Sequence, residues 1–147
     1  MKLTTKMRYG TRVMLELAVH YERGPVSLSE IAERQQLSEK YIESLASNLR
    51  SAGLLQSTRG SQGGYHLTRP PEQITLWDIF GVLEGPGPFV PCTADPGICQ
   101  RRDVCVTQEV WASMYDASVR ILQATTLADL VERSLEKQGQ TVVMYSI

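Results

Sequence analysis

Residues 27–67 have the sequence SLSEIAERQQLSEKYIESLASNLRSAGLLQSTRGSQGGYHL, which begins with a helix-capping signal. Ser27 is followed three residues later by Glu30, and this spacing is that of a capping box. The serine hydroxyl accepts from a free backbone N–H at the helix start, and the glutamate carboxylate reaches back to the amide of the capping residue. The pattern predicts a short helix over about residues 28–35.

A second helix is predicted from its N-cap Ser38 to about Ala52, and Gly53 suits the left-handed residue that ends a helix. Its apolar face consists of Tyr41, Ile42, Leu45 and Leu49. Two short helices joined by a tight turn, the second with a polar outer face, form the helix-turn-helix pattern. Any αα-hairpin gives the same pattern, so these residues alone leave DNA binding and a plain helical hairpin both open.

The residues after the second helix predict a β-hairpin. Leu54 and Leu55 lead into one strand, and Tyr65 and Leu67 alternate out of the turn. The tip holds Arg59, Gly60, Gly63 and Gly64. A hairpin in this place is the wing of a winged helix, where glycines allow close backbone approach and an arginine can enter a narrow minor groove. The alternative is an ordinary glycine turn with a solvated arginine.

Two further helices are predicted on either side of this stretch. Apolar residues recur at helical spacing over about residues 4–22 and predict an amphipathic helix that ends at Gly24-Pro25. Thr75 can cap another helix, over about residues 76–84. Glycine and proline are so frequent in residues 85–106, here called the cysteine loop, that we expect neither helix nor strand there.

Regular patterning resumes at about Thr107 and predicts a long helix. Its apolar stripe consists of Val110, Trp111, Met114, Ser118, Ile121 and Leu122. A compact winged helix has no obvious place for this stripe, so we expect it to pair with the same helix of a second chain; packing back on its own domain is the alternative. Thr126 starts a last predicted helix, and the tail 141–147 is expected to be a strand or a loose end.

The expected fold class is mainly α with a small β-hairpin wing. A winged helix-turn-helix DNA-binding domain would occupy residues 1–84, the cysteine loop residues 85–106, and a dimerisation helix with a C-terminal segment residues 107–147. A homodimer places two recognition helices about a two-fold axis, which suits a palindromic operator in double-stranded DNA.

Composition and charge restrict the function. The chain has 147 residues, of which 42 % are hydrophobic and 21 % charged, as in a globular protein. No apolar run approaches the roughly 20 residues that cross a bilayer, and the N-terminus does not have the pattern of a signal peptide. We therefore expect a cytoplasmic protein with no membrane contact. An enzyme is not expected, because the sequence contains no Ser/His/Asp set, Walker loop or H-E-x-x-H helix.

The two halves of the chain differ in charge. Residues 1–69 carry ten Lys or Arg against six acidic residues, a balance of +4, whereas residues 70–147 carry five against ten, a balance of −5. A basic first half favours contact with the phosphates of nucleic acid.

All three cysteines lie in the cysteine loop, at Cys92, Cys99 and Cys105. Their spacing differs from the C-x2-C of zinc ribbons and ferredoxins. Soft thiolates favour iron–sulfur clusters, zinc or copper(I), and Arg101 and Arg102 would stabilise thiolate charge. A metal or cluster site, redox-active thiols and three unrelated thiols all remain open on spacing alone.

The motifs together resemble one known family. They are TTKMRYGTRVMLELA, the stretch from SLSEIAERQQ to TRGSQGGYHLTRP, ITLWDIFGVLEG, the three cysteines with CVTQEVW, and TLADLVE. In this order they are similar to the Rrf2 family of bacterial winged-helix transcription regulators, which includes IscR, NsrR and CymR types, over about residues 3–132. The resemblance implies a homodimeric DNA-binding repressor or activator. It also implies an iron–sulfur cluster on Cys92, Cys99 and Cys105, [2Fe–2S] in preference to [4Fe–4S].

The resemblance leaves the fourth cluster ligand open. Gln108 stands where the IscR type has a histidine, and Arg8 and Arg12 stand where other branches have ligands in the first helix. Arginine cannot ligate a metal. The candidates are therefore Gln108, Glu109, Asp103 and Asp95, or an exogenous thiol or water.

The resemblance also implies DNA contacts by matching position. Hydroxyls and Lys40 suit phosphate, and Glu43 can accept from a cytosine amino group in the major groove. The wing tip would read the minor groove, and Thr4, Lys6 and Tyr9 would touch backbone phosphates. The expected DNA-binding residues are Ser38, Lys40, Tyr41, Glu43, Ser44, Arg59, Gly60, Gly63 and Gly64.

The expected function is therefore a transcription regulator whose operator affinity depends on a cluster that senses iron–sulfur status, redox stress or nitric oxide. We expect a change in the cysteine loop to reach the DNA-binding unit through the helix at residues 76–84. Two alternatives keep DNA binding: a regulator with a thiol redox switch or structural zinc, and a CymR-like regulator controlled by a protein partner.

Overall fold

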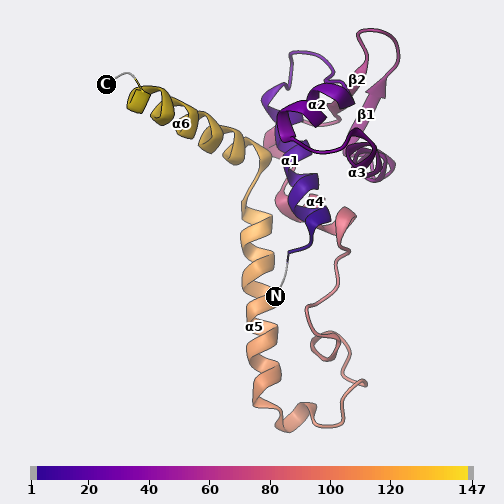
Figure 1. Cartoon of the computed structure of the whole chain (residues 1–147). Helices are drawn as coiled ribbons and strands as arrows, with labels where there is room; N and C mark the ends of the chain where they lie inside the picture. The colour runs from indigo at the N-terminus through magenta and orange to yellow at the C-terminus, as the bar shows by residue number, and fades with distance from the viewer. Residues whose placement is uncertain (1–2, 146–147) are drawn as a thin grey trace.

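The computed structural model describes residues 3–145, with side chains described as far as residue 140. The mainly α fold with a β-hairpin wing is confirmed (Figure 1). In chain order the elements, with 3₁₀ helices written η, are α1 (Thr5–Val19), α2 (Leu28–Gln35), α3 (Glu39–Ser51), β1 (Leu55–Thr58), β2 (Gly64–Leu67), η1 (Pro71–Gln73), α4 (Leu76–Leu83), η2 (Pro91–Thr93), η3 (Arg102–Val104), α5 (Val106–Ala124) and α6 (Leu127–Tyr145). Among the described helices, none is both long enough and apolar enough to cross a bilayer.

Capping interactions form the helix-turn-helix as predicted. The hydroxyl of Ser27 accepts from the backbone N–H of Glu30 at 3.3 Å, and the Glu30 carboxylate accepts from the backbone N–H of Ser27 at 3.0 Å. The C-cap of α2 is Gln36, whose φ of +53° is left-handed, and the N-cap of α3 is Ser38. The helix predicted over residues 28–35 is confirmed, and α3 ends at Ser51, one residue before its predicted end.

The wing is an antiparallel hairpin in which Leu55 pairs with Leu67. A backbone bridge between Val26 and Tyr65 attaches β2 to the segment before α2, with N···O distances of 2.9 and 2.8 Å. Both strands of the hairpin are therefore attached to the helix-turn-helix: β2 pairs with the segment before α2, and β1 follows α3 directly in the chain.

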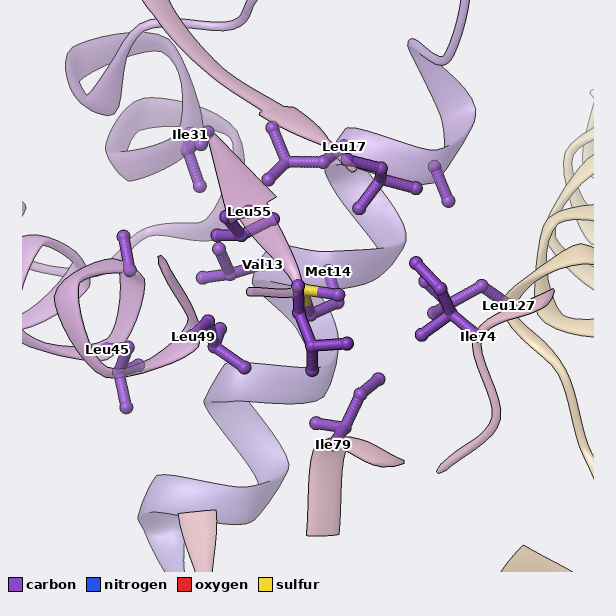
Figure 2. Packing of buried hydrophobic residues seen from close by; sticks show 14 of the residues in the cluster. Val13, Met14, Leu17, Ile31, Leu45, Leu49, Leu55, Ile74, Ile79 and Leu127 are labelled. Atoms are coloured by element: carbon purple, nitrogen blue, oxygen red, sulfur yellow. The ribbon is translucent and has the colours of Figure 1, made fainter. Parts of the chain in front are cut away.

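Helix α1 lies in the middle of the hydrophobic core (Figure 2). Its side chains Val13, Met14 and Leu17 are at most 2 % exposed. Leu127, the first residue of α6, is also fully buried and lies beside Ile74 in Figure 2. The other elements contribute Ile31, Leu45, Leu49, Leu55 and Ile79. Burial of apolar surface, at roughly 25 cal/mol per Å², is the main force that holds these elements together.

Helix α4 packs closely on the first half of α1. A Cβ atom at Gly10 would lie 2.2 Å from Cδ1 of Leu83, a side chain that is only 2 % exposed. The hydroxyl of Thr4 also donates a hydrogen bond to the carboxylate of Glu84. The end of α4, where the cysteine loop begins, is thus held against the start of α1.

Figure 1 shows the cysteine loop running away from the unit formed by α1 to α4 and the hairpin, with α5 returning beside the loop. The loop contains the single-turn helices η2 and η3, so the expectation of no helix in residues 85–106 is wrong at these two turns. Proline at the first position of η2 does not prevent a 3₁₀ turn, because its missing N–H has no partner there. The division of the chain at residue 84 stays a prediction.

The C-terminal helices are longer than predicted. Helix α5 begins at Val106 rather than Thr107, and α6 continues to Tyr145. The strand or loose end expected for the tail is therefore wrong for residues 141–145, and residues 146–147 lie outside the described part. Thr141, Val142 and Val143 have strand propensity, but extending an already formed helix costs little, and it runs through them.

Replacing Gly10 with alanine is expected to destabilise the protein. Alanine gains about 1 kcal/mol over glycine from helix propensity, but the added methyl group overlaps Leu83, and overpacking costs about 1–3 kcal/mol. Denaturant unfolding of Gly10→Ala should show a net loss of about 1 kcal/mol. Gly139→Ala is the matched control, because Gly139 is an exposed glycine of α6 with open space around its Cβ position. Equal gains in both variants would contradict the close α1–α4 contact.

Candidate DNA-binding surface and cysteine loop

The predicted DNA-binding side chains of α3 lie on its outer face. Ser38, Lys40, Glu43 and Ser44 are exposed, whereas the inner face of the helix is buried in the core. Ser38 also caps the helix, since its hydroxyl accepts from the backbone N–H of Tyr41 at 3.3 Å. The helix therefore presents two hydroxyls, one ammonium and one carboxylate to the outside, which are groups that contact phosphates and base edges.

Tyr41 is half-buried because its ring meets Tyr9 of α1. The ring centroids are 6.1 Å apart and the planes are at 86°, an edge-to-face contact. Through this contact the half-buried Tyr9 ring supports α3, and the phosphate contact predicted for Tyr9 stays a prediction. Thr4 and Lys6, the other residues predicted at the start of α1, are exposed.

The wing tip combines an exposed arginine with glycines that the turn requires. Arg59 and Gly60 are exposed, and Gly60 has a φ of +111°, which favours glycine. A Cβ atom at Gly63 would lie 2.2 Å from the carbonyl oxygen of Thr58, and one at Gly64 would lie 2.3 Å from the carbonyl oxygen of Val26. The close backbone contacts therefore require glycine at these two positions, whether or not the wing binds a ligand.

The wing is also joined to the recognition helix. Nη1 of Arg50, in the last turn of α3, donates to the hydroxyl of Ser57 on β1 at 3.3 Å. This contact joins β1 to α3 one residue pair before the turn, and the exposed Arg59 lies at the tip of the hairpin.

The three cysteines are spread along the cysteine loop. Cys92 lies in η2, Cys105 is the N-cap of α5, and all three thiols are free and half-buried. Within the described residues, no three Cys, His, Asp or Glu side chains come together in an arrangement that could hold a metal ion. The loop is anchored on α5, where the Tyr115 hydroxyl donates to the carbonyl of Pro86 at 3.0 Å.

The surroundings of Cys105 favour its thiolate form. Its pKa is lowered by the hydroxyl of Thr107, whose oxygen is 3.3 Å from Sγ, then by the backbone N–H groups of Gln108 and Thr107, and by the charge of Arg101. Each of these groups favours the thiolate, because it donates to the sulfur or carries positive charge.

Three of the four candidate side chains for the fourth ligand lie close to Cys105 in sequence. Gln108 is half-buried and Glu109 is exposed, and both lie in the first turn of α5. Asp103 is exposed in η3, two residues before Cys105. Asp95 lies earlier in the loop, between Cys92 and Cys99, and its carboxylate accepts from the backbone N–H of Gly97 at 2.8 Å.

Helix α5 buries none of its residues against the rest of the chain. Val110 is 52 %, Trp111 41 % and Ile121 65 % exposed. Of the apolar stripe that the helical spacing predicted, these three side chains and Met114 are exposed in the single chain, whereas Ser118 and Leu122 are half-buried.

Sequence reasoning missed the contacts that join α1 to the helix-turn-helix turn. The guanidinium of Arg12 lies over the ring of Tyr9 and donates to Gln35 at the end of α2. Residues 12 and 35 are far apart in sequence, so no local periodicity indicates the pairing.

Comparisons with known proteins agree with this geometry. Residues 3–133 match the model of the Rrf2 family, described as an iron-dependent transcriptional regulator. The chain is 44 % identical over 131 residues to protein rrf2 of Nitratidesulfovibrio vulgaris, covering 89 % of this chain and 87 % of that protein.

Two solved structures are equally similar to this chain. CymR, the global cysteine regulator of B. subtilis, has a TM-score of 0.79 at 42 % identity, covering 90 % of this chain and 98 % of that one. T. potens IscR has a TM-score of 0.78 at 43 % identity, covering 94 % and 91 %. These relatives are regulators rather than enzymes, and the chain belongs to the Rrf2 family of winged-helix, DNA-binding transcriptional regulators.

Proposed function

We propose that this regulator is a homodimer whose affinity for a palindromic operator is set by the state of the cysteine loop, through an iron–sulfur cluster held by Cys92, Cys99 and Cys105. The observation that carries the proposal is that all three free thiols lie on one loop that leads into a helix with exposed apolar side chains. The family description, an iron-dependent transcriptional regulator, supports the same function.

The donor set fits such a cluster in its chemistry. Three thiols are soft ligands, and the lowered pKa of Cys105 favours the thiolate form that binds iron. The backbone hydrogen bonds within residues 90–105 join groups at most four residues apart, so closing this part of the loop around a group would break no long-range bond among them. A bound [2Fe–2S] cluster would supply a redox- and nitric-oxide-sensitive group at this place.

The fourth donor would come from the side of Cys105. Gln108 is the first candidate, because it is half-buried one helical turn from that thiol, and its amide oxygen can donate a lone pair. Glu109 and Asp103 are carboxylate alternatives, and an exogenous thiol or water is another.

The homodimer would cover the apolar stripe of α5. Val110, Trp111 and Ile121 are exposed large hydrophobic side chains on one helix, which a second copy of that helix would bury. Two copies of α3 and of the wing would then face one DNA duplex, with Lys40 and Arg59 toward phosphates or the minor groove and Glu43 toward base edges.

A signal in the loop would reach the DNA-binding unit through α4. Leu83 and Glu84 immediately precede the loop, and they contact Gly10 and Thr4 of α1. Helix α1 in turn supports α3 through the contact of Tyr9 with Tyr41. Any displacement of the start of the loop therefore acts on the helix that carries the recognition helix.

A second candidate function keeps DNA binding and replaces the cluster. The thiols would then act as a redox switch or hold a structural zinc ion, or a protein partner would control the regulator as in CymR-like regulators. Two observations favour it. The structure resembles a global cysteine regulator as closely as it resembles IscR, and the lowered pKa of Cys105 suits thiol exchange as well as metal binding.

The recognition helix can be tested with a site selected from random-sequence DNA. Lys40→Ala should weaken binding to all sequences and reduce the slope of log affinity against log salt by about 1, because it removes one phosphate contact. Glu43→Ala should change the selected base at one position and leave the salt slope unchanged. Arg133→Ala, an exposed cation on α6, is the control and should change neither. If both α3 variants bind DNA like the control, α3 is not the recognition helix.

Cluster binding can be tested by anaerobic reconstitution with ferrous iron and sulfide. The protein should turn brown and contain both elements, whereas replacing any one of Cys92, Cys99 or Cys105 with serine should reduce the bound iron severalfold, because each thiolate supplies a ligand. Ile98→Ala, which changes an exposed side chain next to Cys99, is the control and should bind iron normally.

The same experiment separates the alternatives. Colourless protein with stoichiometric zinc would replace the cluster with a structural metal. Colourless, metal-free protein after reconstitution would contradict both metal sites and favour the thiol switch or the protein partner.

A further inference from the structure

Arg12 holds the turn of the helix-turn-helix from the outside. Its Nε donates to the side-chain Oε1 of Gln35 at 2.8 Å, and its Nη2 donates to the backbone oxygen of Gln35 at 2.8 Å. Arg12 lies on the polar face of α1 and is exposed, whereas Gln35 is the last residue of α2. One guanidinium thus binds both the side chain and the main chain of the residue that precedes the turn.

The backbone oxygen of Gln35 is one of the last carbonyls of α2, which lack partners within their own helix. The next residue, Gln36, has a left-handed φ of +53°, a conformation that is unfavourable for a non-glycine residue. Leu37 then donates its backbone N–H to the carbonyl of Ala32 at 3.1 Å. A charge-assisted hydrogen bond to the Gln35 oxygen stabilises this turn, whose geometry sets the direction of α3.

Arg12 also acts on the other side of the turn. Its guanidinium carbon lies 5.3 Å from the centroid of the Tyr9 ring, a cation–π contact, and that ring meets Tyr41 in the first turn of α3. Arg12 therefore contacts the end of α2 directly and the start of α3 through Tyr9. Tyr41 stands next to Lys40 and close to Glu43, two of the proposed DNA-contacting side chains.

A second set of bonds fixes Gln35 from the other direction. Its Nε2 donates to Oε2 of Glu16 at 2.9 Å, and Nη1 of Arg34 donates to Oε1 of the same carboxylate at 2.7 Å. Both oxygens of the Glu16 carboxylate thus hold the end of α2 against α1. The Gln35 side chain has its oxygen on Arg12 and its amide on Glu16, so it cannot turn without breaking a bond.

We propose that Arg12 is a positioning residue for DNA recognition: it orients α3 through the Gln35 carbonyl and the Tyr9 ring, and it does not bind phosphate itself. Its two hydrogen bonds to Gln35 use the planar fork of the guanidinium, and its contact with the Tyr9 ring uses the flat face. A lysine ammonium keeps the charge but cannot donate along two parallel directions while stacking on a ring. The proposal concerns DNA binding alone and is independent of what the cysteines hold.

Arg12→Lys separates this role from a phosphate contact. We expect the affinity for a selected DNA site to fall about tenfold, the loss that a charge-assisted hydrogen bond accounts for. Affinity for a scrambled duplex and the salt slope should stay unchanged, because no phosphate contact is removed. Amide hydrogen exchange at Gln36 and Leu37 should become faster, since the turn opens more often.

Arg8→Lys is the matched control. Arg8 is another exposed arginine of α1 whose guanidinium carbon lies 5.8 Å from the centroid of the Tyr9 ring, and its conversion should leave the specific affinity and the exchange at the turn unchanged. Gln35→Met is a second test, because it removes the side-chain acceptor for Arg12 and the side-chain donor to Glu16 but keeps the backbone acceptor for Arg12. We expect a smaller loss of specific affinity, again with an unchanged salt slope.

Two results would overturn the proposal. The first is that Arg12→Lys binds DNA as well as the parent protein, while Arg12→Gln binds both the selected and the scrambled duplex more weakly and reduces the slope of log affinity against log salt by about 1. Arg12 would then be a phosphate contact. If Arg12→Lys and Arg8→Lys have the same specific affinity and the same exchange rates at Gln36 and Leu37, Arg12 has no part in positioning α3.

Discussion

Helix α1 is held on two sides at once, and the DNA-binding unit depends on this arrangement. Its apolar face, with Val13, Met14 and Leu17, is fully buried among side chains from the other elements of the unit. Its polar face binds the end of α2 through Arg12 and Glu16. Burial supplies most of the free energy of folding, but it depends little on the exact angle between helices. The hydrogen bonds are directional and fix the turn before α3. The recognition helix therefore takes its orientation from α1.

The same helix connects the unit to the cysteine loop. Gly10 allows Leu83 to approach α1 closely, and Thr4 bonds to Glu84 at the point where the loop begins. Beyond that point the chain is open: the loop makes local turns, and α5 buries none of its residues in the single chain. A change in the loop would therefore act on a tightly packed DNA-binding unit, as the proposed sensor requires.

Sequence patterns predicted the elements well because their signals are local. The capping box of Ser27 and Glu30, the helical spacing of Val13, Met14 and Leu17, and the glycines of the wing all specify structure within a few residues. Patterns failed where local propensity and context disagree, as in the tail, where a helix extends through a strand-forming run. They also could not reveal Arg12 with Gln35 or Tyr9 with Tyr41, because such contacts depend on how helices pack. The ligand set of the cysteines depends on how the loop closes, which no spacing specifies.

The central claim is that the cysteine loop controls DNA affinity. The most direct test measures the affinity of one anaerobic preparation for a selected DNA site, at one salt concentration, with the cluster loaded and after its removal by a chelator. Both forms would be checked for an unchanged dimer. We expect the two affinities to differ at least tenfold, which corresponds to a coupling free energy of about 1.4 kcal/mol between the loop and DNA. Equal affinities of the loaded and the cluster-free dimer would contradict it.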